Sequence, residues 1–160
     1  RQERQAQMNK IPYSTATAGD RALMELQKSL AKFGCASFGT AIDAERGVTC
    51  VSFKWRERVV HLEASWKGYA ASLLRGVKMP YRPEDRAKKQ SEALQQARTS
   101  VCSVLRDWTK AQITAVEAGV MSFEAAFMPH MLLKDGRRVI DAAQALLPAP
   151  AEDKVVELGQ

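Results

Sequence analysis

Hydrophobic and polar positions along the chain first repeat with the period of a helix. The apolar positions that share one face are Leu23, Leu26, Leu30 and Phe33. Thr17–Asp20 resembles a capping box, and Gly34 stands where a C-terminal cap is expected. The pattern therefore predicts a helix of about four turns over residues 17–34.

The period then changes to strict alternation in three short runs, over residues 38–42, 48–55 and 60–64. Polar turns at 43–47 and 56–57 separate them, which predicts an antiparallel meander of three strands. One face of this sheet is apolar and is expected to pack on the first helix. The other face bears Lys54, Arg58, His61 and Glu63, and we expect it to be wet or covered by another part of the chain.

A short helix and a long helix are predicted next. Ser65 can cap a helix that reaches Leu74 and stops at Gly76, and an irregular connector containing Pro80 follows. A helix from Pro83 to Ala118 would be about 52 Å long. Its first third is polar, and its later part has a sevenfold apolar stripe, formed by Val101, Trp108 and Ala115 and by Val104, Ala111 and Ala118. The sheet, another helix or a second copy of the chain could cover this stripe.

The last predicted elements are small. Residues 122–127 read as a short helix closed by Pro129, and residues 131–133 and 139–140 flank Asp135-Gly136 as a β-hairpin. Asp141 can cap a final helix through Leu147. The fold class is thus α+β: helix, three-stranded antiparallel meander, helix, long helix, C-terminal β-hairpin and short helix.

The chain length of 160 residues fits a single domain with extended ends. We expect a flexible arm over 1–16, one α+β domain over 17–147 and a flexible tail over 148–160. The domain has a helix–sheet–helix half, 17–76, and a long-helix-plus-hairpin half, 84–147. No stretch is apolar enough to span a membrane, and RQERQAQMNK has no secretory pattern, so a cytoplasmic location is expected.

Charge distinguishes one quarter of the chain. Lys and Arg number 24 against 18 Asp and Glu, a net charge of +6, and the whole excess lies within residues 54–89. Aromatic side chains alternate with these cations in Lys54-Trp55-Arg56, Trp66-Lys67 and Tyr81-Arg82, a composition typical of single-stranded nucleic-acid binding. The candidate nucleic-acid-binding residues are Lys54, Arg56, Arg58, Lys67, Arg75, Lys78, Tyr81, Arg82, Arg86, Lys88 and Lys89. A merely well-solvated surface, with Trp55 and Trp66 in the core, is the alternative.

Catalytic and metal chemistry have less support in the sequence. Cys35, Cys50 and Cys102 are widely spaced, without the close ligand pairs of structural zinc sites, so no metal or cofactor is assigned. His61 and Glu63 project from one strand face, where a solvated charged pair competes with an acid–base pair. An enzyme would need His130, Glu124 and Glu117 to converge in one pocket. No catalytic residue is assigned.

The second half of the chain contains a distinctive set of spaced positions: Trp108, Ala115 to Gly119, Ser122 to Glu124, Phe127, His130, Leu133, Asp135, Gly136 and Val139. At these positions the chain resembles a family of small proteins encoded by tailed bacteriophages and prophages. The helix that ends in Phe33-Gly34, the three strands and the basic linker fit the same family. The resemblance implies a phage setting, among genes for replication, recombination and anti-defence functions, and no particular reaction.

Together these observations and the resemblance predict a phage or prophage accessory protein that binds nucleic acid weakly and with little sequence preference, with replication or recombination as the expected setting. The alternative is a protein that docks on a host or phage protein, such as an inhibitor of a bacterial defence system, through the long helix and the Phe123–Phe127 segment. Self-association through residues 94–118 is a further possibility, because an alanine-rich stripe permits close approach of helices.

Overall fold

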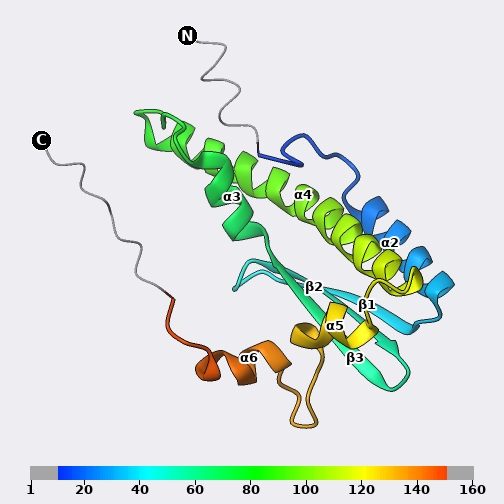
Figure 1. Cartoon of the computed structure of the whole chain (residues 1–160). Helices are drawn as coiled ribbons and strands as arrows, with labels where there is room; N and C mark the ends of the chain where they lie inside the picture. Colours follow the sequence, from blue (N-terminus) through cyan, green and yellow to red (C-terminus); the bar gives the residue numbers. More distant parts are fainter. Residues whose placement is uncertain (1–10, 151–160) are drawn as a thin grey trace, which may run out of the picture.

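A computed structural model describes residues 11–150 and shows an α+β fold (Figure 1). Within this range the elements, in chain order, are α2 (Asp20–Phe33), β1 (Ala36–Asp43), β2 (Val48–Trp55), β3 (Arg58–Ser65), α3 (Trp66–Leu74), α4 (Pro83–Glu117), α5 (Phe123–Phe127), the 3-10 turn η1 (Met128–His130), α6 (Val139–Ala143) and η2 (Gln144–Leu146). The strands form one antiparallel sheet in the order β1-β2-β3. The predicted fold class is confirmed.

Local side chains explain most of the helix boundaries. Gly34 ends α2 in the left-handed conformation, at φ 104°, as predicted. The Ser65 hydroxyl accepts a hydrogen bond from the Gly68 N–H and begins α3, and Ser122 caps α5 in the same way. The predicted capping box of α2 is wrong, since α2 begins after Gly19, at φ 50°, with no side-chain cap.

The hairpin between β2 and β3 turns in two residues, Arg56 and Glu57, which both have positive φ. A two-residue turn needs this twist, which glycine or asparagine usually supplies. Here the turn is held from both sides, because Lys54 pairs with Glu57 at 3.1 Å and the Arg56 guanidinium stacks on Trp55. The tight turn fixes the register of the two strands, with Ser52 opposite His61 and Cys50 opposite Glu63.

The core lies between the sheet and the helices. Val51, Phe53, Val60 and Leu62 project from one face of the sheet and are buried. An aromatic cluster closes the end of the core near the β2–β3 turn, where Trp55 and Phe123 stack with their ring centroids 4.2 Å apart. Phe33 and Phe127 extend this cluster. Phe123, Ala126 and Phe127 are therefore part of the core, and only Glu124 and Ala125 of the Phe123–Phe127 segment remain at the surface for the docking that the sequence suggested.

The long helix α4 is as long as predicted, but of the predicted stripe only Val101 is buried, while Val104 and Ala115 are half-buried. Its buried positions include Ala93, Ala97, Ser100, Val101, Leu105, Thr109 and Ile113. Those positions follow the helical period and pack against α2, α3 and the sheet. Ala111 and Ala118 of the predicted stripe are exposed, and Trp108 is at the surface, in edge contact with Phe127 and His130. Contacts within the chain thus cover the apolar seam.

Residues 11–16 do not form a loose arm, in contrast to the sequence prediction. The Tyr13 hydroxyl donates a 2.7 Å hydrogen bond to Asp107, and the buried Ser100 hydroxyl donates one to the Tyr13 carbonyl. Gln96 donates to the Ala16 carbonyl. These bonds attach the segment to α4, and the sequence missed them because each depends on a partner more than 75 positions away. The parts of the predicted arm and tail at 1–10 and 151–160 lie outside the described residues.

The predicted C-terminal β-hairpin is reduced to a single bridge. Leu132 pairs with Arg138, and Met131 pairs with Val60 at the free edge of β3. Val139 and Ile140, predicted as strand, are the first residues of α6. The Asp141 carboxylate receives two hydrogen bonds from Arg138, which places a negative charge at the helix start and favours a helix there. Over residues 11–150, no helix is both long and apolar enough to cross a bilayer.

Candidate functional site

The candidate nucleic-acid-binding residues fall into separate groups. Lys54, Arg56 and Arg58 lie at the β2–β3 turn, whereas the residues from Arg75 to Lys89 lie around the α3–α4 connector. Strand β3 alone covers about 26 Å, at about 3.3 Å per residue, and α3 adds about 13 Å. Figure 1 shows the turn and the connector at opposite ends of the molecule. The structure therefore does not gather all eleven residues into one surface.

The cations at the β2–β3 turn take part in folding contacts. Lys54 is paired with Glu57, and Arg56 lies 4.4 Å from the centre of the Trp55 ring. Arg58 is exposed beside a shallow groove that also contains Lys134 and Asp135. Among residues 11–150, Lys54 is the one of these three cations that makes an ion pair, because Asp135 is paired with Arg137 at 2.9 Å. Position, and not neutralisation, therefore separates these three cations from the other candidates.

Lys67 belongs neither to the β2–β3 turn nor to the α3–α4 connector, and it contacts the β1–β2 turn. Its ammonium donates a 2.6 Å hydrogen bond to the Glu45 carbonyl. Its aliphatic part covers Gly47, where an added Cβ would lie 2.2 Å from the Lys67 Cγ. The turn needs glycine there for that reason and for its φ of 67°. Lys67 thus has a structural role.

The remaining candidates lie on the α3–α4 connector and on the helix ends beside it, together with the exposed acids Glu84 and Asp85, and we call these candidates the basic tip. Its members are Arg75, Lys78, Tyr81, Arg82, Arg86, Lys88 and Lys89. All are exposed except the half-buried Lys89, and among residues 11–150 none of the six cations makes an ion pair. Arg86 and Lys89 donate to the carbonyls of Pro80 and Lys78, which ties the connector to the start of α4.

Only one of the aromatic side chains that alternate with the cations is available for stacking. Trp66 is buried, and Trp55 is packed between Phe33 and Phe123. Tyr69 donates its hydroxyl hydrogen bond to the Pro12 carbonyl. Tyr81, in contrast, is 95% exposed on the basic tip. The alternative reading of Trp55 and Trp66 as core residues is therefore confirmed.

A second group of polar side chains lies on the sheet face opposite the core. Cys50 and Ser52 of β2 face Glu63 and His61 of β3 across the register. The Ser52 Oγ and His61 Nδ1 are 2.7 Å apart, and the His61 Nε2 is 3.5 Å from a Glu63 carboxylate oxygen. We call these four residues the outer cluster.

Two arginines cover the outer cluster. Arg46 donates two hydrogen bonds to the Glu63 carboxylate, and Arg138, from the start of α6, lies 3.4 Å from it. The hydrogen bonds from Arg46 hold the pKa of Glu63 below its ordinary value, although burial opposes this effect. Burial raises the pKa of the Cys50 thiol. Both outcomes that the sequence left open for this face occur: Arg138 covers Glu63 from outside the meander, whereas Arg58 is exposed.

His130 does not share a pocket with the two glutamates that an acid–base site would require. Glu124 lines an apolar groove beside α6, and Glu117 lines a groove between α2 and α4. Burial, and then the charge of Arg138, lower the pKa of His130, so its neutral form is favoured. Its Nδ1 is buried without a hydrogen-bond partner among the described residues. His130 packs edge-on against Trp108 in this position.

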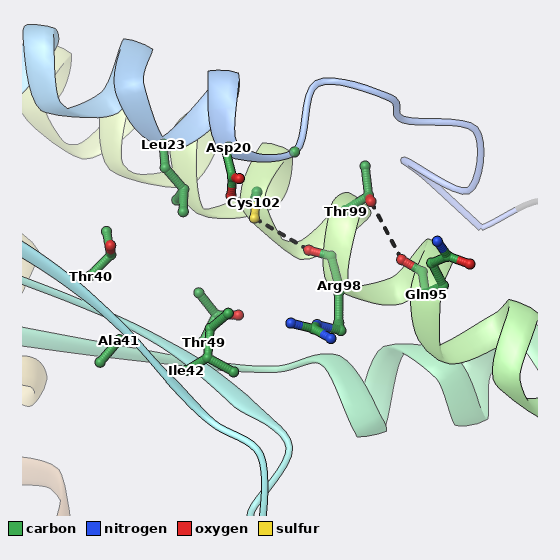
Figure 2. Close-up of a pocket in the computed structure, with 11 residues that line it drawn as sticks. Asp20, Leu23, Thr40, Ala41, Ile42, Thr49, Gln95, Arg98, Thr99 and Cys102 are labelled. Carbon is green, nitrogen blue, oxygen red and sulfur yellow. Dashed lines mark hydrogen bonds between the residues drawn. The ribbon is translucent and has the colours of Figure 1, made fainter.

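A cleft of about 560 Å³ separates the helix pair α2–α4 from the edge of the sheet, and Figure 2 shows its lining. Asp20 and Leu23 line it from α2, Thr40 and Ile42 from β1, and Arg98, Thr99 and Cys102 from α4. The Thr99 hydroxyl and the Cys102 thiol donate to carbonyls of their own helix, and burial raises the pKa of Cys102. The cleft therefore contains no activated nucleophile.

Comparison of the chain with models of protein families, with characterised proteins and with solved structures finds no match. The function of this chain is therefore inferred from its own geometry. The sequence analysis did not group Cys50 with His61 and Glu63, because metal ligands were expected close together along the chain. The two-residue turn at 56–57 was the available signal, since a tight hairpin fixes which positions face each other.

Proposed function

We propose that the protein binds single-stranded nucleic acid weakly, and with little sequence preference, through the basic tip. The observation that supports this is the group of six cations that make no ion pair around the exposed Tyr81. Cations in such a group raise the local potential and neutralise phosphates, and an exposed aromatic ring offers a stacking face to any base. The tip has no arrangement for reading base edges, so we expect tolerance of sequence.

The setting that we propose is a phage or prophage, with a role in replication or recombination, and it rests on the sequence resemblance. The position of the basic tip is suitable for contacting the backbone of a flexible single strand of nucleic acid. The basic tip sits on a short connector between two helix ends, and Tyr81 and Arg82 precede the first turn of α4 directly. Cations there reach a backbone without disturbing any core side chain.

Docking on a host or phage protein is the rival function, and the structure changes where its interface would lie. The seam of α4 is buried, but exposed apolar side chains gather beside α5 and α6, among them Met128, Ile140, Leu146 and Leu147. An apolar interface holds at high salt, whereas binding driven by phosphate contacts does not. Salt dependence therefore separates the two functions.

Fluorescence anisotropy with a labelled single-stranded oligonucleotide tests the proposal. We expect binding at low salt that weakens steeply as salt rises, with a log–log slope no steeper than about −4 for six phosphate contacts at about −0.7 each. The triple variant Arg82→Glu, Lys88→Glu and Lys89→Glu should lose this binding for every oligonucleotide sequence. Absence of binding by the unaltered protein at low salt would exclude the function.

A matched control separates local charge from total charge. Arg21, Lys28 and Lys32 are exposed on α2, away from the tip. Their triple replacement by Glu lowers the net charge by the same amount as the tip variant. We expect the α2 variant to retain most of the affinity, and equal losses in both variants would show that the tip is not the binding surface.

A further inference from the structure

The outer cluster brings together the three side-chain types that bind transition metals best. The Cys50 Sγ, a His61 ring nitrogen and a Glu63 carboxylate oxygen all lie within 4.8 Å of one another. They come from paired positions on two strands whose register is fixed by a two-residue turn, so the backbone holds them together. Cys50 is 8% exposed and the Glu63 side chain 15% exposed, so the group is only partly open to water.

The spacing between His61 and Glu63 fits a shared cation better than it fits a direct hydrogen bond. The His61 Nε2 and the Glu63 oxygen are 3.5 Å apart, which is long for a hydrogen bond. Ligand atoms at about 2.0–2.3 Å from a tetrahedral zinc ion lie about 3.3–3.7 Å from each other. The gap therefore matches one edge of a zinc coordination tetrahedron.

The other ring nitrogen of His61 is already engaged. Its Nδ1 is 2.7 Å from the Ser52 Oγ. Histidines that bind metals usually donate their second N–H to an oxygen, which fixes the tautomer and the direction of the ring. A proton on Nδ1 would be donated to Ser52 and would leave the Nε2 lone pair, 3.5 Å from the Glu63 oxygen, available for a metal.

Charge balance is compatible with a divalent cation despite the two arginines nearby. Arg138 is paired with Asp141 at 2.8 Å, and Arg46 lies 3.9 Å from Asp43, so each guanidinium has a carboxylate besides Glu63. A Cys50 thiolate and the Glu63 carboxylate would neutralise the two charges of the ion. The arginines would then orient Glu63 from outside the coordination sphere.

We propose that Cys50, His61 and Glu63 form a zinc site with three protein ligands and one open position. A thiolate, an imidazole and a carboxylate together favour Zn²⁺ over Mg²⁺ or Ca²⁺, which prefer oxygen ligands only. Three protein ligands leave the fourth position for water or for a group from a partner. The site is separate from the basic tip and does not depend on nucleic-acid binding.

Isothermal titration of the reduced, tag-free protein with ZnCl₂ tests the site. We expect one equivalent of Zn²⁺ to bind, and Cys50→Ser and His61→Ala each to weaken the affinity by tenfold or more. The chain offers matched controls, because Cys102→Ser and His130→Ala remove the same residue types elsewhere and should bind as the unaltered protein does. Binding that Cys50→Ser leaves unchanged would overturn the proposal, as would the absence of saturable binding.

Titration with Co²⁺ gives a readout that does not depend on the stability of the Cys50 variant. The unaltered protein should show the thiolate-to-cobalt charge-transfer absorption and the d–d bands of tetrahedral Co²⁺. The double variant Cys35→Ser and Cys102→Ser, in which Cys50 is the one remaining thiol, should show the same spectrum. Loss of the charge-transfer band in the double variant, or its absence from the unaltered protein, would contradict the assignment.

Discussion

At the residue scale, Tyr81 is the side chain whose position is hardest to explain by folding. It is 95% exposed, although a tyrosine normally covers apolar surface in the core or at an interface. It follows Pro80 and precedes Arg82 in the connector between α3 and α4, which lies at one end of the molecule (Figure 1). Its ring is free to stack on a base, and this leads to a direct test.

Tyr81→Ala should weaken single-stranded nucleic-acid binding by about 1–3 kcal/mol, the usual contribution of one stacked base. Tyr81→Phe keeps the ring and should bind nearly as the unaltered protein does. Neither change should alter the free energy of unfolding, because the side chain makes little contact with the fold. Anisotropy and urea unfolding measure the two effects, and equal affinities of the Ala and Phe variants would exclude stacking.

Asp107 shows how one carboxylate attaches the N-terminal segment to the domain. It accepts hydrogen bonds from the Arg106 side chain at 2.8 Å and from the Tyr13 hydroxyl at 2.7 Å. The bond from Arg106, and then that from Tyr13, hold the pKa of Asp107 below its ordinary value. A carboxyl whose pKa is lower in the folded state stabilises the fold above its unfolded pKa and loses this contribution as the pH falls.

We therefore expect Asp107→Asn to destabilise the protein at neutral pH and to have a smaller effect below about pH 3.9, the ordinary aspartate pKa. The side chain is partly exposed, so solvent screening limits the effect to about 1 kcal/mol or less. Urea unfolding of both proteins at pH 7 and pH 3 measures the difference. A destabilisation of equal size at both pH values would show that the Asp107 charge is not its cause.

Single residues also set the limit of what could be predicted from the sequence. Gly34, Ser65 and Ser122 cap helices as expected, because a cap acts on a backbone group within three positions. Thr17 does not cap α2, and the residues before it are instead bound to α4, where the Ser100 hydroxyl donates to the Tyr13 carbonyl. That attachment depends on contacts far apart in sequence, and no local pattern contains it.

At the scale of elements, the helices and strands were predicted more accurately than the surfaces they bury. Periodicity located α2, the meander and α4 to within three residues at each end. For α4, the sevenfold stripe was an incomplete guide, since of its members only Val101 is buried and much of the buried face consists of small residues against α2 and α3. Apolar character alone could not identify that face, because Ser100 and Thr109 are buried in it as well.

A substitution on α4 distinguishes the two faces. Ala97 is fully buried, at 0% exposure, and Ala97→Leu should destabilise the fold by about 1–3 kcal/mol through overpacking. Ala111 belongs to the predicted stripe but is exposed, so Ala111→Leu should change stability by less than about 0.5 kcal/mol. Thermal or urea unfolding measures both variants. A larger loss for Ala111→Leu would indicate that the stripe is the packed face.

At the scale of the whole molecule, the position of the net charge along the chain was a poor guide to where the cations lie in the structure. The sequence placed the whole excess of +6 within residues 54–89. A strand and a helix run through the middle of that window, so the chain carries its two ends far apart. Lys54, Arg56 and Arg58 were expected to join the surface, but they lie at the opposite end of the molecule.

The outer cluster illustrates the converse case, in which distant positions along the chain meet. Cys50 and Glu63 are separated by a whole hairpin, and Arg138 comes from the other half of the chain. Strand register could have predicted that Cys50 lies opposite Glu63. The contact between Arg138 and Glu63 depends on how α6 packs, so only the tertiary structure shows it.

We propose that nucleic acid contacts the α3–α4 connector and not the β2–β3 turn at the opposite end of the molecule. Amide chemical-shift mapping of the ¹⁵N-labelled protein, titrated with a short single-stranded oligonucleotide, tests it most directly. We expect the shifts to cluster on residues 75–89, while the amides of Arg56, Glu57 and Arg58 stay unchanged. Shifts concentrated at the β2–β3 turn, or no shifts at low salt, would contradict the account.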